Sequence, residues 1–203
     1  MEPVTHFLTG ACLGRSGFNR KTAYATLAMT LAAEAPDIDI LWGWRGPVAE
    51  LQHHRGITHT LIAAPAMALL VTGFVWGVHR LRRKPPVIAP RWLLIWVFAM
   101  IAHLSHLLLD FTNNYGIRPF FPFNAHWYAW SIVFIFDPVI FALLLVALVV
   151  PWILGLADRE IGAKKKPFRG RGWAIASLTL IVLWWGVRNA EHLHAMELVK
   201  TGT

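Results

Sequence analysis

Long apolar runs separated by short basic segments are the feature that most constrains this chain. The runs over Thr58–His79 and Arg91–Phe111 each hold about 20 residues, which is the length of helix that crosses a hydrocarbon core of about 30 Å. Only 15% of the 203 residues are charged and 56% are hydrophobic, whereas a soluble domain carries roughly 25% charged residues. The sequence therefore predicts an all-α, polytopic membrane helix bundle.

We expect about four to five apolar helices plus short N-terminal helices. The expected apolar segments are Ala23–Ala35, Thr58–His79, Arg91–Phe111, Trp127–Leu156 and Gly172–Val187. The first is too short to span alone unless it is tilted or packed within the bundle, and Thr58 is a plausible N-cap of the second. No internal repeat or linker divides the chain, so residues 1–203 are predicted to form a single integral membrane domain.

The basic residues are distributed unevenly among the loops. Fourteen lie in three alternate segments, which are Arg15–Lys21, Arg80–Arg91 and Arg159–Arg171. Because loops rich in lysine and arginine stay in the cytoplasm, the loops around residues 36–57 and 112–126 are predicted to be extracytoplasmic. The net charge of +8 is thus interpreted as a topology signal, and no direct nucleic-acid contact is expected.

The single cysteine, Cys12, excludes an intramolecular disulfide and a zinc–thiolate cluster. Any transition metal must then be held by imidazole and carboxylate groups. His103, His106 and Asp110 lie at i, i+3 and i+7 of one apolar segment, so they point within about 60° of one another on a helix, and Asn114 continues the stripe. This pattern favours a metal site, with a polar stripe that joins helices as the alternative.

Two further clusters of polar residues lie earlier in the chain, at residues 37–39 and 53–59. His53, His54, Arg55 and His59 fall within seven residues before an apolar run, and Asp37 and Asp39 end the first apolar stretch. The first cluster could also be a solvated interfacial segment, and one of the two adjacent histidines is expected to point away. Under the predicted topology, seven of the polar residues approach the same, extracytoplasmic side of the membrane. They are His6, Asp37, Asp39, His54, His59, His106 and Asp110.

Convergent imidazole and carboxylate groups suit zinc, manganese or iron, with zinc favoured and manganese possible. A divalent metal that keeps a position open for water predicts hydrolysis. Asp137, within the fourth apolar segment, needs a partner such as a metal, Arg118 or a histidine. We expect it in the outer shell of the site, together with Arg118, His103 and Asn114.

The motifs occur in a definite order. They are Thr5-His6, Pro36-Asp37-Ile38-Asp39, His54-Arg55-Gly56-Ile57-Thr58-His59, Ser105-His106 to Asp110, Asn114-Tyr115-Gly116 with Pro122-Phe123, and Asp137-Pro138. This ordered set, over residues 5–138, resembles the YdjM-like family of LexA-binding, inner-membrane-associated proteins to which a metal-dependent hydrolase activity is ascribed. His53 and His103 are extra relative to the family's pattern.

The resemblance implies a multi-pass protein of a bacterial-type inner membrane, a metal-dependent hydrolase activity, and a looser kinship with zinc-dependent phospholipases. The leading hypothesis is hydrolysis of an ester or phosphoester in a lipid-like or membrane-associated substrate, with the site on the extracytoplasmic side. The expected metal ligands are His6, Asp37, His59, His106 and Asp110. Asp39 and His54 would orient ligands or act as general base, and Arg55 would stabilise an oxyanion or hold a phosphate.

Two other functions are compatible with the same residues. The same ligands could form the transport site of a metal-ion or proton carrier, although the opposite halves of the helices look uniformly apolar. They could also form a structural metal site in a non-enzymatic membrane protein that binds another protein, and removal of the metal would then unfold the chain. LexA binding does not follow from these residues.

Overall fold

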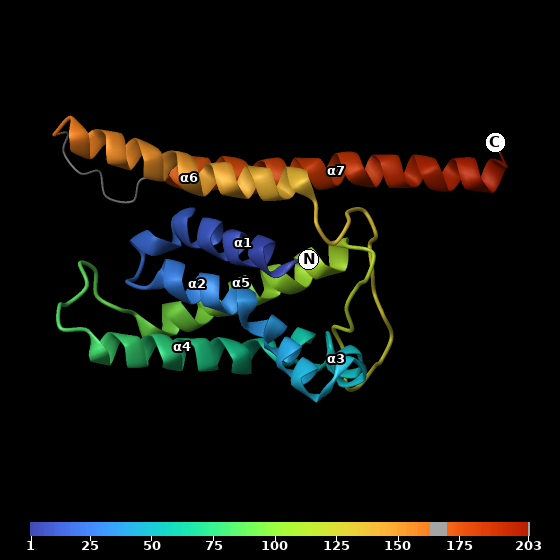
Figure 1. The fold of residues 1–203 in the computed structure, drawn as a ribbon, viewed down its shortest axis with the longest axis horizontal. Coiled ribbons are helices and arrows are strands. Elements are labelled where there is room, and N and C mark those ends of the chain that lie inside the picture. Colours follow the sequence, from blue (N-terminus) through green and yellow to red (C-terminus); the bar gives the residue numbers. More distant parts are fainter. Residues whose placement is uncertain (163–169, 203) are drawn as a thin grey trace.

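The computed structural model describes residues 1–162 and 170–202, and this part of the chain is built from helices (Figure 1). The elements in order are α1 Pro3–Arg15, η1 Phe18–Arg20, α2 Ala25–Glu34, η2 Ala35–Arg45, α3 Pro47–His53, η3 Ile57–His59, α4 Ala64–Leu81, α5 Trp92–Thr112, α6 Pro138–Glu160 and α7 Arg171–Thr201. The predicted all-α class is confirmed.

Four helices, α4 to α7, are long and apolar enough to cross a membrane. Their outer faces expose large apolar side chains, such as Leu70 of α4 and Trp152 and Ile153 of α6. An apolar surface of this kind matches the apolar chains of the bilayer. The predicted number of about four to five apolar helices plus short N-terminal helices is confirmed.

Two helix starts differ from the prediction. The second long helix begins at Ala64, so Thr58 lies in the short 3-10 turn η3 and does not cap it. The Thr60 hydroxyl instead accepts a hydrogen bond from the Ala63 N–H at 3.2 Å. Pro65, in the first turn of α4, suits a helix start because it has no N–H to leave unpaired.

The expected helix over Trp127–Leu156 is wrong in its first eleven residues, which form an irregular segment before α6. Helix α6 starts at Pro138, and Asp137 is its N-cap. The Asp137 carboxylate accepts hydrogen bonds from the N–H groups of Val139 and Ile140. An Asp-Pro pair is a strong helix start, and it overrides the apolar character of the preceding residues. Helix α7 also runs beyond the expected end at Val187, to Thr201.

Helices α1 and α2 form a tightly packed pair. Gly10 and Gly14 face α2. A Cβ atom on Gly10 would lie 2.6 Å from the Met29 carbonyl oxygen, and one on Gly14 would lie 2.5 Å from Thr26 Cα. The spacing of four residues is the small-xxx-small pattern that lets membrane helices approach closely. This close contact fixes the position of His6, which lies one turn before Gly10.

Figure 1 shows α6 and α7 on one side of the pair α1–α2 and α4 on the other, with α5 crossing behind α2. The connections α1–α2 and α4–α5 lie at one end of the bundle, at the left in Figure 1, and η2 and α3 lie toward the other end. Two of the three basic segments therefore share one end. The third, Arg159–Arg171, falls largely at 163–169, outside the described residues.

Candidate metal centre

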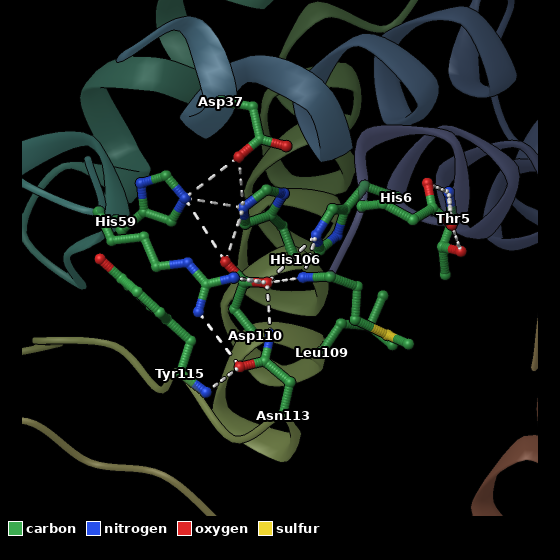
Figure 2. A network of polar contacts seen from close by, with 12 residues as sticks. Thr5, His6, Asp37, His59, His106, Leu109, Asp110, Asn113 and Tyr115 are labelled. Carbon is green, nitrogen blue, oxygen red and sulfur yellow. Dashed lines mark hydrogen bonds and ion pairs between the residues drawn. The ribbon is translucent and has the colours of Figure 1, made fainter. Parts of the chain in front are cut away.

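Five side chains from four elements meet at the end of the bundle opposite the basic connections (Figure 2). They are His6 of α1, Asp37 of η2, His59 of η3, and His106 and Asp110 of α5. Their potential ligand atoms form two groups that share His106. One group is His6, His106 and Asp110, and the other is Asp37, His59 and His106. The structure thus brings together all five residues expected to bind metal.

Four of these side chains place one donor atom each at the corners of two triangles that share the edge between His59 and His106. His59 Nε2 lies 3.1 Å from His106 Nε2, 3.3 Å from Asp37 Oδ1 and 3.5 Å from Asp110 Oδ2. His106 Nε2 lies 3.6 Å from Asp37 Oδ1 and 3.5 Å from Asp110 Oδ2. In a regular tetrahedron with ligands about 2.0–2.1 Å from a zinc ion, donor atoms are about 3.3–3.4 Å apart. Each triangle therefore fits three ligands of one such ion, and we call the four residues the His/Asp set.

The hydrogen bonds of the two central histidines leave their Nε2 lone pairs facing each other. His106 Nδ1 lies 2.7 Å from the Ala33 carbonyl oxygen, which only accepts, so Nδ1 carries the proton. His59 Nδ1 lies 3.3 Å from a carboxylate oxygen of Asp39, which assigns its proton in the same way. Two lone pairs 3.1 Å apart repel each other, and a cation bound by both removes the repulsion.

His6 completes the cluster on the side of α1. Its ring stacks on that of His106 with centroids 3.7 Å apart, and its Nε2 lies 3.3 Å from Asp110 Oδ1. The backbone nitrogen of Met1 lies in the same place, 2.9 Å from His6 Nε2 and in contact with Asp110. In the described part of the chain, Asp110 Oδ2, the oxygen that faces His59 and His106, is buried and accepts no hydrogen bond. A divalent cation fits this unpaired oxygen.

Arg55 holds Asp110 in place. Its Nη2 donates to Asp110 Oδ1 at 2.9 Å and its Nη1 to the Gly116 carbonyl oxygen at 2.6 Å. Burial lowers the pKa of the guanidinium to about 10, so it stays charged at neutral pH. Its Nε has no hydrogen-bond partner among the described residues, and Arg55 lines the adjoining pocket, so the predicted contact with a substrate phosphate stays a prediction.

Asp39 and His54 lie beside the ligand His59. Asp39 accepts a hydrogen bond from the Arg55 N–H at 2.7 Å and lies close to both histidines. Burial alone would raise the pKa of the Asp39 carboxyl, but hydrogen bonds from His54, His59 and Arg55 outweigh it and hold that pKa below its usual range. His54 Nδ1 lies 3.6 Å from Asp39 Oδ1, and its side chain is 36% exposed.

The centre adjoins an open pocket of about 660 Å³. Asp37, Asp39, His54 and Arg55 form one part of its wall, and apolar residues form much of the rest, including Leu31, Ile38, Ile40 and Ile135. Asp37 is the exposed member of the His/Asp set, with 17% of its side chain accessible, while His59, His106 and Asp110 are at most 1% accessible.

Sequence reasoning missed three residues at this centre. Asn113 is fully buried, and its amide bonds to Asp110 and Arg55. Gly116, with φ of 77°, approaches Tyr128 so closely that a Cβ would lie 2.5 Å from its carbonyl oxygen. Glu34 lines the pocket, where burial, and then the charge of Asp37, raises the pKa of its carboxyl to about 7. Gly116 belongs to the Asn114-Tyr115-Gly116 motif, and Asn113 directly precedes it, so this segment was the available signal for the first two.

Of the four residues expected in the outer shell, Asn114, Arg118 and Asp137 make no contact with the five candidate ligands among the interactions of the described residues. Asn114 is exposed because α5 ends at Thr112, so the helical stripe stops before it. Arg118 packs over the rings of Phe121 and Trp127. Asp137 caps α6 and accepts a hydrogen bond from Trp184 Nε1 at 3.1 Å.

His103, the fourth, is fully buried on α5 but belongs to neither group of potential ligands. His53 stacks on Trp42 at 4.0 Å and bonds to the Ala49 carbonyl. It is therefore the member of the adjacent histidine pair that points away, as expected.

Comparison with known proteins places this centre in a family. The chain is similar to the "Uncharacterized protein YfhP" of Bacillus subtilis (strain 168), with 27% identity over 163 residues, which are 76% of this chain and 47% of that protein. The chain thus spans about half the length of this curated relative. No solved structure matches. The family match extends over residues 1–195, and it includes every residue of the centre. The chain belongs to the YdjM inner membrane protein family, and it is a multi-pass membrane protein of that family.

Proposed function

We propose that this protein is a membrane-embedded, metal-dependent hydrolase that cleaves an ester or phosphoester bond in a lipid-like, membrane-associated substrate. The observation that carries the proposal is the His/Asp set of His59, His106, Asp37 and Asp110, whose one partly exposed member lines an open pocket. Catalytic metal sites keep one coordination position for water, and a triad such as Asp37, His59 and His106 leaves that position free.

The residues of the centre would have three roles, which are metal binding, orientation of the ligands and proton transfer. His59, His106, Asp37 and Asp110 would hold a divalent cation, with His6 available as a further ligand. Such a cation lowers the pKa of water and polarises the bond to be cleaved. Asp39 orients His59 through its Nδ1, and Arg55 orients Asp110. His54 remains partly exposed beside Asp39 and is the candidate for proton transfer at the pocket.

The wall of the pocket supports an amphiphilic substrate. Its charged groups lie at one part of the wall, beside the ligands, and Leu31, Ile38 and Ile40 offer apolar surface next to them. Ile38 and Ile40 are also more than half exposed on the outside of η2. A substrate with a polar ester head and an apolar chain would place each part against a matching surface. Zinc is the favoured metal because its tetrahedral geometry fits the donor distances, with manganese as the alternative.

A structural metal site is the second candidate, and one observation favours it. The His/Asp set offers four protein donors, the number found in closed structural zinc sites, and three of the four are buried. In this case metal removal would unfold the chain.

The structure favours transport less. The fully buried histidines and charged side chains of residues 1–162 and 170–202 gather around the centre and the start of α6, with no such group leading to the other end.

Metal content and activity of the detergent-purified protein test the proposal. We expect about one or two zinc or manganese ions per chain, together with chelator-sensitive cleavage of a fluorogenic phospholipid or of bis(p-nitrophenyl) phosphate. The double variant His106→Ala, Asp110→Ala should lose both, whereas His53→Ala, which removes a histidine stacked on Trp42, should keep both. Activity that survives chelation and the double substitution would refute the hydrolase. Unfolding on chelation, without any activity beforehand, would favour the structural site.

A further inference from the structure

A second pocket, of about 670 Å³, lies at the end of the bundle where the basic connections gather. It is formed by η1, the first turns of α5 and the start of α7, and we call it the basic pocket. The lining residues that matter for its chemistry are Phe18, Arg20, Lys21, Leu94, Phe98 and Arg171. The metal centre lies toward the other end, in the second half of α5, so the two pockets are separate.

We propose that the basic pocket binds one anionic phospholipid from the leaflet on its own side of the membrane. The proposal does not depend on the hydrolase activity. Three cationic side chains line the pocket, and no acidic residue is among its described lining residues. Basic pockets between membrane helices bind the phosphate head groups of anionic lipids in this way.

The polar and apolar parts of the basic pocket are ordered along the membrane normal. Arg20 and Lys21 lie on the connection outside the helices, and Arg171 is the first residue of α7. Leu94 and Phe98 lie about 3 and 9 Å further along α5 from its first residue. Phe18 packs edge-on against Phe98, with ring centroids 4.6 Å apart. Charges at the rim and aromatic and aliphatic groups below match a phosphate followed by acyl chains.

The lipid would bridge two parts of the fold. Arg171 Nε donates to the Ser16 carbonyl oxygen at 3.0 Å, a polar link between the start of α7 and the α1–η1 turn. The remaining lining residues come from the α1–α2 connection and from α5, and Phe18 and Phe98 among them belong to the packed group of α2, α4 and α5. A phosphate held by Arg171 together with Arg20 or Lys21 adds a contact between α7 and that group.

Native mass spectrometry of the detergent-released full chain, titrated with lipid, tests this proposal. The probes are phosphatidylglycerol, zwitterionic phosphatidylcholine, and glycerol phosphate, which has the head group without chains. The main variant is Arg20→Gln, Lys21→Gln. Its matched control is Arg83→Gln, Lys84→Gln, which removes one arginine and one lysine from the exposed α4–α5 connection at the same end.

We expect one tightly held phosphatidylglycerol per chain, much weaker phosphatidylcholine binding and no retained glycerol phosphate. A basic residue near an anionic lipid contributes roughly a fivefold factor, so the double variant should bind about 30-fold more weakly. Lys21→Gln alone should lose about fivefold, and it tests the proposal if the double variant misfolds. Equal loss in the control variant, or equal binding of phosphatidylcholine, would overturn the proposal. Equal binding of glycerol phosphate would overturn it in favour of a soluble phosphate ligand.

Discussion

Replacing Asp39 by Asn tests whether metal affinity depends on a carboxylate outside the His/Asp set. Asp39 Oδ2 lies 3.3 Å from His59 Nδ1 and 2.7 Å from the Arg55 nitrogen, and the residue is 4% exposed. The amide oxygen of Asn can still accept one of these hydrogen bonds, so the substitution chiefly removes the negative charge. Loss of such an orienting group typically weakens metal affinity 10- to 100-fold, or by about 1.4–2.7 kcal/mol. His59 then becomes a weaker, less well-oriented donor.

The assay is a zinc titration of the metal-free protein in competition with a chromophoric chelator, with circular dichroism as the check of folding. Asp37→Asn removes a direct donor and should weaken zinc more than Asp39→Asn does. Glu191→Gln, on the exposed face of α7 next to Arg188, is the control and should bind as wild type does. Two outcomes would refute the reasoning. If folded Asp39→Asn binds zinc with unchanged affinity, Asp39 orients nothing, and if it binds as weakly as Asp37→Asn, Asp39 is itself a ligand.

Three further predictions concern packing, pH and topology. Gly14→Ala should lower the free energy of unfolding by about 1–3 kcal/mol in detergent, because its Cβ would meet backbone atoms of Thr26, while Gly73→Ala, with open space around it, should not destabilise the chain. The folded pKa of the Glu34 carboxyl is raised to about 7, so the stability that its protonated form contributes is lost as pH rises from about 4.5 to about 7. Measured in chelator, the thermal midpoint of wild type should therefore fall over this pH range relative to the midpoint of Glu34→Gln. A constant difference between the two midpoints would contradict this. In a Cys12→Ser background, an impermeant maleimide should label His126→Cys in intact spheroplasts and Arg83→Cys only after lysis, and the reverse pattern would invert the predicted orientation.

The sequence predicted the helices best where membrane crossing alone decides the pattern. Arg91–Phe111 was expected and Trp92–Thr112 is observed, because an apolar run flanked by a basic segment leaves few other structures possible in a bilayer. The start of α6 was missed because Trp127 to Phe136 is as apolar as a helix would be. Hydropathy cannot distinguish a helix from an irregular segment that packs on other helices. The local signal was the Asp137-Pro138 pair, a cap followed by a proline.

The same limit explains which site residues could be predicted. His106 and Asp110 lie within α5, where helical periodicity holds, so their common face followed from their spacing. Asn114 was placed by extending that periodicity past Thr112, where the chain turns, and the adjacent Asn113 takes the buried position instead. A residue one step beyond a helix end has no fixed direction, so spacing predicts nothing there.

The partners of the loop residues depend on backbone conformation that spacing does not encode. Arg55 adopts a left-handed φ of 53°, so its N–H meets Asp39 while its side chain reaches Asp110. Through its backbone N–H and its guanidinium, Arg55 therefore joins Asp39, the carboxylate beside His59, to Asp110, the candidate ligand from α5. A non-glycine residue in this conformation is disfavoured, and here buried hydrogen bonds at both ends of Arg55 hold it. The loop from η2 to η3 is thus tied to α5 by one residue, a link that the spacing of the sequence motifs does not reveal.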